Sequence, residues 1–432
     1  MLSINKSYFY IFLFSIISLF VSRNFFQQAD ELMLVLMAGL AGCDMVLNRN
    51  VHRYRLLFAL MGVMLFYLLY SMATSKYNSH FAQLYDFILQ SKPLIAFSLS
   101  YALTPKFTRK EKFVIKIACV SVAVLCTLIV LADLTDSLLQ HVYYQGLACA
   151  CCGLTYLFMS YNPAIEKRFK KSDIMWTIAI LAMGLACTRA KYYGFFVFFL
   201  YMLYLYRPGS VNLKKPRNVI ITVGALSLVI LVAWEKIVYY FIPDTSVIDV
   251  DILETYARPV LYSGALLVLL DYPLLGSGLA SFATFSSSTN IQYSSLYHDY
   301  GFSIVYGLSP EYDAFICDTF FPELAQFGLV GVLLFSTFCW WIWRKNRLLL
   351  RVYDLKLFLI AVCALGLLAI DATSSCAILQ SAGQIMMMIM GICAGLVKHI
   401  PKTEAKALLK QNITQFYNKN KKIKTTQYGK KF

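Results

Sequence analysis

Runs of apolar residues alternate with short polar segments along almost the whole chain, and most of the runs are longer than a β-strand. A helix that crosses a bilayer needs about 17 to 25 mainly apolar residues. With shorter runs accepted where their polar flanks fit, the pattern predicts an all-α polytopic membrane protein with about twelve transmembrane helices. The expected limits are 8–22, 31–47, 56–73, 90–104, 113–132, 141–160, 173–188, 191–206, 218–240, 322–343, 357–371 and 377–397.

The positions of the cations test this count, because Lys and Arg favour cytoplasmic loops. If the N-terminus is cytoplasmic, the segments assigned to that side hold all but seven of the 39 Lys and Arg residues. One helix too many or too few would exchange the sides of every later loop and destroy this asymmetry. The sequence therefore predicts that both termini are cytoplasmic. The seven exceptions are Arg23, Lys76, Lys92, Arg189, Lys191, Lys236 and Arg258.

Composition excludes a soluble domain and argues against nucleic-acid binding. Of the 432 residues 59% are hydrophobic and 14% charged, whereas about a quarter of a soluble domain is charged. The net charge of +16 comes from short basic patches between apolar runs, so no nucleic acid is expected as a partner. Residues 398–432 are expected to form a basic cytoplasmic tail on anionic membrane lipids. Cys149, Cys151 and Cys152 have no second ligand pair in register, which favours helix packing over a metal site.

One loop is much longer than the others. Residues 241–321 separate the ninth and tenth expected helices and form the large external part of a single transmembrane domain over 1–397. An apolar stretch of about a dozen residues ends at Asp271, before a Pro-Leu-Leu-Gly-Ser-Gly turn; it is too short to span a bilayer and predicts a short interfacial helix. Pro273, Gly276 and Gly278 are expected to shape the turn. An extracytoplasmic function would reside in this loop.

Three cations lie where a membrane protein normally avoids charge. Arg189 and Lys191 separate the seventh and eighth expected helices at their outer end, and Arg258 begins the apolar segment of the long loop. Two guanidinium groups at headgroup depth suit a lipid-linked phosphate or pyrophosphate, because arginine offers a fixed fork of donors to phosphate oxygens. The alternative is that these side chains only extend to the lipid headgroups.

Three blocks of sequence resemble the family of bacterial O-antigen polymerases and O-antigen ligases. They are CTRAKYYGFFVFF from Cys187, ARPVLYSGALLVLLDYPLLGSGLASF from Ala257 and CDTFFPELAQFGLVGVLLF from Cys317, in the family's order around the same external loop. The resemblance implies a glycosyltransferase that uses undecaprenyl-pyrophosphate-linked oligosaccharide at the outer face of the bacterial inner membrane, without metal or other cofactor. It also implies that Arg189 and Arg258 hold the pyrophosphate, with a chain-length regulator and a flippase as partners.

The resemblance identifies the catalytic base, which would take the proton of the acceptor hydroxyl, less clearly than it identifies the two arginines. Ligases of the family typically carry a His where this chain has Cys317, and polymerases more often show an Asp followed by a small polar residue, as in Asp318-Thr319. Asp318 is therefore the leading candidate, and a repeat-unit polymerase is favoured over a ligase. Tyr297 and Tyr300 are candidates for stacking on sugar rings. Rival bases on the loop or at its end are His298, Asp299, Glu311, Asp313 and Glu323.

Two alternatives stay open. One is an O-antigen ligase or protein O-glycosyltransferase of the same family, in which His298 serves as the base. The other, of a different class, is a twelve-helix transporter or flippase, which normally shows internal repeats and ionisable residues in mid-membrane. The two halves of the chain show no convincing similarity, and the deepest charges, Asp44 and Asp371, are expected near helix ends.

Overall fold

The computed structural model describes residues 3–21, 26, 28–161, 169–205, scattered positions between 216 and 234, 252–352 and 355–397. Within these ranges every regular element is a helix, as the apolar pattern predicts. Three segments are long and apolar enough to cross a membrane, Val51–Thr74, Arg109–Leu131 and Phe320–Leu349. The chain is therefore an all-α protein with helices of membrane-spanning character.

Eleven of the twelve expected segments are helical in the part of the chain that is described, and the ninth, 218–240, lies mostly outside it. Short helices and 3-10 turns connect some of the long ones. The helices that correspond to the eleven segments are α1 (Ile4–Val21), α2 (Ala29–Asn48), α3 (Arg55–Thr74), α4 (His80–Leu103), α5 (Arg109–Leu131), α7 (Tyr143–Met159), α8 (Lys171–Met183), α9 (Ala190–Leu205), α14 (Gly328–Val352), α15 (Leu355–Asp371) and α16 (Ser381–Leu396).

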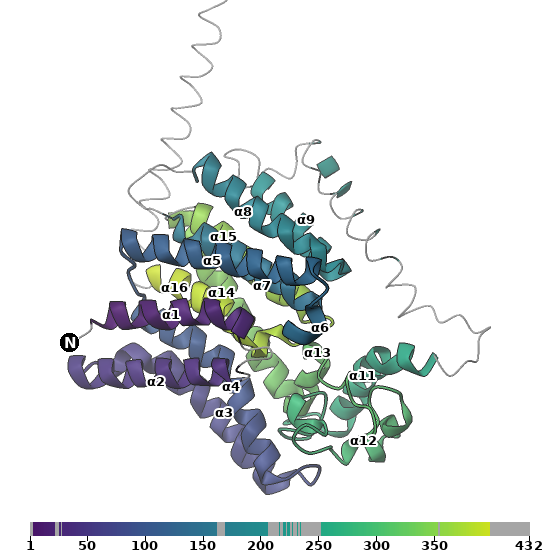
Figure 1. Ribbon diagram of the computed structural model, residues 1–432. Helices are drawn as coiled ribbons and strands as arrows, with labels where there is room; N and C mark the ends of the chain where they lie inside the picture. Colours follow the sequence, from purple (N-terminus) through teal and green to yellow (C-terminus); the bar gives the residue numbers. More distant parts are fainter. Residues whose placement is uncertain are drawn as a thin grey trace, which may run out of the picture.

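The last helix lies at the centre of the bundle. Figure 1 shows α1, α5 and α7 running side by side around α16, which packs most extensively against α4 and also contacts α1, α7, α14 and α15. Residues 381–395 of α16 are all buried, including the methionine-rich stretch from Met386 to Met390. Unbranched thioether side chains fill irregular gaps between several neighbours, which suits a helix surrounded on all sides.

Two helices extend about nine or ten residues past an expected limit. Helix α4 begins at His80 instead of residue 90, because the Ser79 side chain accepts a hydrogen bond from the Ala82 N–H (3.4 Å) and so caps the helix. The polar residues Gln83, Asp86 and Gln90 point into the protein and hide this first half from an apolar-run count. Helix α14 continues to Val352 through basic residues expected in a loop, since cations are favourable near a helix C-terminus.

Because α4 starts earlier than expected, Lys92 lies in the interior of this helix. Lys92 was expected near the outer end of a helix, but it lies well inside α4 and its side chain is buried. It forms ion pairs with Asp30, at 2.8 Å, and with Glu31, both in the first turn of α2. The expectation that Asp44 and Asp371 are the deepest charges is therefore wrong, although Lys92 is neutralised by its two partners.

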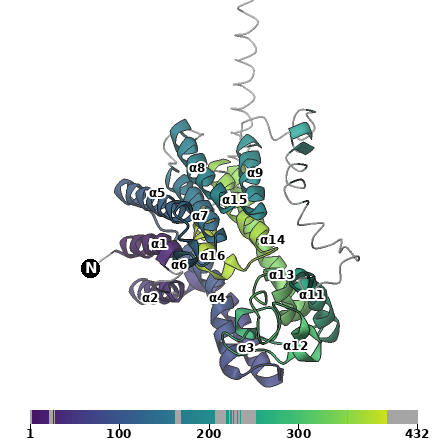
Figure 2. The same cartoon turned by 45° about the vertical axis from the view of Figure 1, so that its right-hand side comes forward.

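The described part of the long loop packs around an apolar core of its own. Helix α11 (Ile252–Asp271) buries Leu261, Ala265 and Val268 against Phe282 and Tyr297. A helix is thus present where the short interfacial helix is expected, and with 20 residues it is longer than the apolar stretch itself. Short elements complete the unit, namely η3 (Phe285–Ser287), α12 (Leu296–Asp299) and η4 (Phe302–Ile304). In Figures 1 and 2 this unit lies beside α3, at one side of the bundle.

The Pro-Leu-Leu-Gly-Ser-Gly turn joins the loop unit to the bundle. Leu329 N–H donates to the Pro273 carbonyl (2.9 Å), and Gly278 N–H donates to the Gln326 carbonyl (3.1 Å). Gly276 has a φ of +79°, and a Cβ there would lie 2.2 Å from the Gln326 carbonyl oxygen. Only glycine fits both the left-handed backbone and this close approach, which confirms the expected turn.

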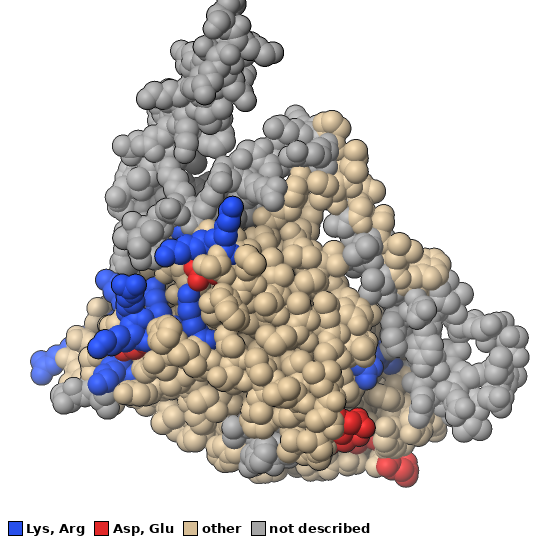
Figure 3. Space-filling model, turned by 45° about the horizontal axis from the view of Figure 1, so that its top comes forward, with Lys and Arg blue, Asp and Glu red and all other residues tan. Residues whose placement is uncertain are grey.

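Charged side chains are unevenly distributed over the surface. Figure 3 shows most of the visible Lys and Arg gathered at one end, and a few cations together with acidic residues at the opposite end. Two of the basic residues form ion pairs, Lys116 with Asp173 at 2.9 Å and Arg53 with Asp44 at 3.3 Å. The helix bundle therefore has a strongly basic end and a second end of mixed charge.

Candidate functional site at the mixed-charge end

The segment with Arg189 and Lys191 breaks the path from α8 to α9. A 3-10 turn, η2 (Gly184–Cys187), follows α8, and Thr188 has a left-handed backbone with φ of 50°. Arg189 is exposed in the break, and Lys191 lies in the first turn of α9. The two cations thus lie between helices, as the sequence predicts, and outside the middle of an apolar span.

Lys191 is held by a partner that the sequence analysis did not link to it. Its Nζ lies 3.4 Å from a carboxylate oxygen of Asp371, donates to the Ser374 carbonyl (3.1 Å) and sits 3.5 Å from the centroid of the Tyr143 ring. The Tyr143 hydroxyl donates to the same carboxylate, which is 1% exposed. Lys191 is therefore anchored at the end of α15.

Arg258 and Asp318 form the second ion pair. Arg258 Nε donates to Asp318 Oδ2 at 2.8 Å, its Nη2 contacts the same oxygen, and both side chains are 27% exposed. Arg258 comes from α11, and Asp318 precedes the short helix α13 (Phe320–Glu323). The pair is thus accessible and joins two parts of the long loop that are 60 positions apart.

The turn after α15 brings the two ion pairs to the same place. Tyr262 of α11 donates its hydroxyl to the Thr373 carbonyl (2.9 Å), and Phe320 N–H donates to the Ala372 carbonyl (3.2 Å). Lys191 bonds to the same turn at Ser374. This turn therefore organises α9, α11 and α13 around one site.

Burial and neighbouring charges set the pKa values of Asp318 and Cys317. Partial burial raises the pKa of Asp318, while the adjacent Arg258 and then Lys191 oppose that rise. Burial and the nearby Asp318 carboxylate raise the pKa of the Cys317 thiol to about 12. Asp318 is consequently a stronger base than an exposed carboxylate, and Cys317 is a protonated thiol at neutral pH.

Arg189 faces a histidine that the sequence analysis did not select. Its Nη2 lies 3.0 Å from Nε2 of His141, just before α7. Desolvation lowers the pKa of His141, and the charges of Arg189, Lys191 and Arg258 lower it further. The imidazole is therefore neutral at neutral pH, and all three cations expected at the site lie close enough to act on it electrostatically.

Other expected residues lie elsewhere in the loop. The ring of His298 packs against Tyr293 with 5.3 Å between ring centroids. Tyr297 is 0% exposed, and its hydroxyl accepts the Ala283 N–H at 2.7 Å. The expectation that Tyr297 stacks on a sugar is therefore wrong in this conformation, because the ring forms part of the loop core. Tyr300 is partly exposed and donates to Asp271 (2.5 Å), away from the Arg258–Asp318 pair.

Two of the rival bases have structural roles. Glu323 is buried, accepts a hydrogen bond from Gln90 and receives the Cys376 thiol at 3.4 Å. Asp313 accepts from the Thr289 backbone (2.6 Å) and hydroxyl (2.8 Å) and so closes a loop turn. Neither carboxylate contacts the cations of the site among the contacts of the described residues. Asp318 is the candidate base that does.

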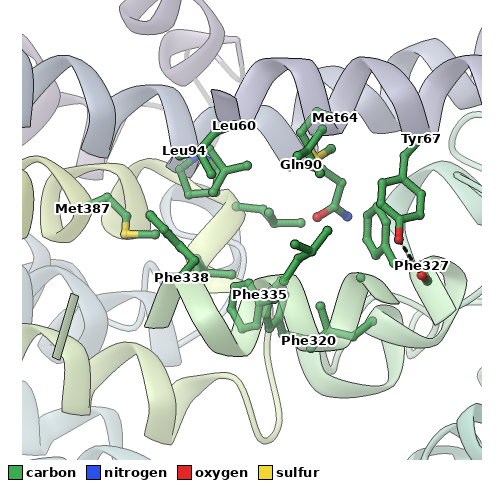
Figure 4. Close-up of a pocket in the computed structure, with 17 residues that line it drawn as sticks. Leu60, Met64, Tyr67, Gln90, Leu94, Phe320, Phe327, Phe335, Phe338 and Met387 are labelled. Atoms are coloured by element: carbon green, nitrogen blue, oxygen red, sulfur yellow. Dashed lines mark hydrogen bonds between the residues drawn. The ribbon is translucent and has the colours of Figure 1, made fainter. Parts of the chain in front are cut away.

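An apolar cavity of about 140 Å³ lies between α3, α4 and α14. Figure 4 shows Leu60, Met64 and Tyr67 of α3 facing aromatic side chains of α13 and α14, with Gln90 of α4 as a polar group at its wall. Phe320, two positions after Asp318, also lines it. The cavity therefore begins close to the ion pair and offers almost only hydrocarbon to a ligand.

Sequence reasoning missed His141, Tyr143 and Asp371 as members of the site. Tyr143 and Asp371 are 228 positions apart, and only the folded bundle brings them together. A signal existed for Asp371, because a charge at the end of an apolar run needs a partner. Within the described ranges, no group of three or more His, Cys, Asp and Glu side chains could hold a metal ion. Neither models of known families nor curated proteins match this sequence.

Proposed function

We propose that this protein is a glycosyltransferase that polymerises lipid-linked oligosaccharide repeat units into a surface polysaccharide. It would work as a multi-pass protein of the bacterial inner membrane, with twelve transmembrane helices, both termini in the cytoplasm and the long loop outside. The observation that carries the proposal is the convergence of Arg258 and Asp318 with Arg189 and Lys191 at the mixed-charge end. Such a site offers cations for a pyrophosphate and a carboxylate for a hydroxyl proton.

The reaction needs one bond to break and one to form. The anomeric carbon of the donor glycan separates from the undecaprenyl pyrophosphate oxygen, which leaves with the electron pair. Arg189 and Arg258 stabilise the charge that builds on the leaving group. An acceptor hydroxyl attacks the same carbon, and Asp318 takes its proton. Because Arg258 is paired with Asp318 in the free protein, a pyrophosphate that draws the guanidinium away would leave the carboxylate available as a base.

The apolar cavity supports a lipid-linked donor. A carrier whose pyrophosphate lies at the ion pair needs a nearby place for its isoprenoid chain, and the cavity begins at Phe320. Its wall is formed by aliphatic and aromatic side chains, apart from Gln90 and the Tyr67 hydroxyl, which is satisfied by the Phe327 carbonyl at 2.9 Å. This combination of cations beside a hydrocarbon cavity fits an amphiphilic pyrophosphate better than a free sugar.

Polymerase is favoured over ligase by the position of the candidate bases. Asp318 pairs directly with Arg258, whereas His298 packs on Tyr293 within the loop unit. A ligase that used His298 would have to bring this side chain to the ion pair.

A gel of surface lipopolysaccharide from a strain that lacks the gene tests the proposal. Loss of the ladder with retention of a core bearing a single repeat unit is the result expected of a polymerase. A bare core with accumulated undecaprenyl-linked polymer would assign the ligase reaction instead. A bare core with undecaprenyl-linked single repeat units retained on the cytoplasmic side would point to a flippase and overturn both enzymatic functions.

A further inference from the structure

Both ring nitrogens of His141 lie within hydrogen-bond distance of an N–H group. The Tyr143 backbone N–H donates to Nδ1 of His141 at 3.0 Å. A neutral imidazole has only one acceptor nitrogen; we assign it to Nδ1, because the Tyr143 N–H lies in the first turn of α7 and has no acceptor within that helix, and this assignment puts the proton on Nε2. That Nε2 lies 3.0 Å from Nη2 of Arg189, and a guanidinium has no acceptor. With this tautomer the contact between Arg189 and His141 joins two donors, and neither group satisfies the other.

A shared acceptor would resolve this arrangement. An oxygen of a phosphate carries several lone pairs and accepts from a guanidinium and a neutral N–H at once. Both side chains are exposed, so a ligand can reach them, and the charges of Lys191 and Arg258 also act on the imidazole. We propose that His141, through Nε2–H, is a second donor to the phosphate oxygen held by Arg189, and that the two together recognise one phosphate of a polyprenyl pyrophosphate.

This inference rests on the proposed function for the identity of the ligand, although the donor pair itself follows from the geometry. It assigns His141 a binding role beyond its contact with the backbone. The simplest competing explanation is that His141 only caps α7, because Tyr143 N–H is one of the first N–H groups of that helix and has no partner within it. A test must therefore separate the two nitrogens of the ring.

Two substitutions make that separation. In His141→Asn the side-chain oxygen falls near the position of Nδ1, which keeps an acceptor for Tyr143 N–H and removes the distal donor. In His141→Gln the side-chain N–H₂ falls near Nε2, which keeps the donor and gives up the cap. The proposal expects Gln to preserve ligand binding and Asn to weaken it, whereas a capping role expects the reverse.

The measurement is binding of farnesyl pyrophosphate to the purified full-length protein in detergent, with farnesyl monophosphate, inorganic pyrophosphate and phosphatidylglycerol as comparison ligands. Loss of a hydrogen bond to a charged group weakens binding about ten- to a hundredfold. We expect a loss of that size for His141→Asn and Arg189→Gln, and a change of less than about threefold for His141→Gln. Binding that is equally strong for phosphatidylglycerol would overturn specific recognition of a pyrophosphate.

The outcomes separate the two proposals. If the unmodified protein binds farnesyl pyrophosphate and His141→Asn binds it equally well, the role of His141 is overturned and the glycosyltransferase function stands. If the unmodified protein binds none of the pyrophosphates, both are overturned.

A measurement without substitution guards against misfolded variants. The chain has 5 His residues, so the ¹⁵N spectrum of histidine-labelled protein is simple enough to assign. It should show a neutral His141 with the proton on Nε2, shifted when farnesyl pyrophosphate is added. A proton on Nδ1, or no shift with bound ligand, would contradict the proposal.

Discussion

Arg189 and Lys191 are only two positions apart, yet their surroundings differ. Lys191 is fixed by Asp371 and by the Tyr143 ring, while Arg189 is exposed, and the contact described for its side chain is with Nε2 of His141. Lys191 therefore contributes positive charge from a fixed point, and Arg189 is the cation available to a ligand. The sequence placed both at the site but could not distinguish them, because their partners come from distant helices.

The exposed position of Arg189 gives a test of bidentate binding. Arg189→Ala should abolish polymer formation, and Arg189→Lys should lower the activity about tenfold or more, since an ammonium group lacks the planar fork of donors. Activity is measured as polymer length on a gel at equal membrane levels of the protein. If Lys restores the full ladder, Arg189 serves only as a charge that extends to the headgroups. Lys6→Ala, at the opposite basic end, is the matched control and should leave the ladder unchanged.

Asp318 should set the acidic limb of the pH profile. The carboxylate must be deprotonated to act as a base, and burial raises its pKa above the ordinary value of 3.8 while Arg258 opposes the rise. Activity should therefore fall as the pH is lowered through this raised pKa. Removal of the guanidinium in Arg258→Gln should lower the maximal activity, raise the pKa of Asp318 further and move the acidic limb of the remaining activity to higher pH.

The acidic limb is measured as the rate at which the purified protein transfers labelled repeat units at a series of pH values. Asp318→Asn should remove the activity together with the limb, because an amide takes no proton. An acidic limb that stays at the same pH in Arg258→Gln would exclude Asp318 as the titrating base. Asp313→Asn is a suitable control, since that carboxylate closes a loop turn and does not contact the cations.

At the scale of elements, the apolar pattern predicted the helices well and their ends poorly. Helix α4 begins before residue 90 because Ser79 caps it and because the side chains of Gln83, Asp86 and Gln90 are buried. Ala280 N–H, for example, donates to Asp86 at 3.0 Å. Polar residues that satisfy a neighbouring segment look like loop residues to a pattern that scores only hydrophobicity, so the true helix start was invisible in the sequence.

The turn between the loop unit and the bundle offers a stability test with an internal control. Gly276 and Gly301 both have positive φ, at +79° and +70°, but only Gly276 has a backbone oxygen in the way of a Cβ. Gly301→Ala should cost about 1 kcal/mol from the left-handed backbone alone. Gly276→Ala should cost clearly more, because the Gln326 carbonyl must also move.

The comparison can be made by heating the two purified variants in detergent and measuring the fraction that stays monodisperse. Gly276→Ala should lose its native state at a lower temperature than Gly301→Ala, and its transferase activity should fall as well, because the turn supports the segment that leads to Asp318. Equal stability of the two variants would show that the turn does not hold the loop unit to α14.

At the scale of the whole molecule, the asymmetry of charge orients the bundle. The site with Arg258 and Asp318 lies around α11 and α13, at the end of the bundle opposite the N-terminus in Figure 1, and most of the cations visible in Figure 3 gather at the other end. Cations favour the cytoplasmic side, so the site should face outward. This is the side on which a polymerase would meet completed lipid-linked repeat units.

Cysteine labelling tests that orientation, and the chain suits it because nine of its twelve cysteines are buried. Replacing the remaining three, Cys43, Cys317 and Cys339, by serine gives a background with little reactivity. In that background Glu311→Cys on the loop should react with a membrane-impermeant maleimide in cells with a permeabilised outer membrane. Lys110→Cys should react only after the inner membrane is opened, because this position is expected on the cytoplasmic side. Both positions are exposed in the fold, so a difference in labelling reports the side of the inner membrane on which each lies. The opposite pattern would place Asp318 in the cytoplasm, where the proposed polymerisation could not use it.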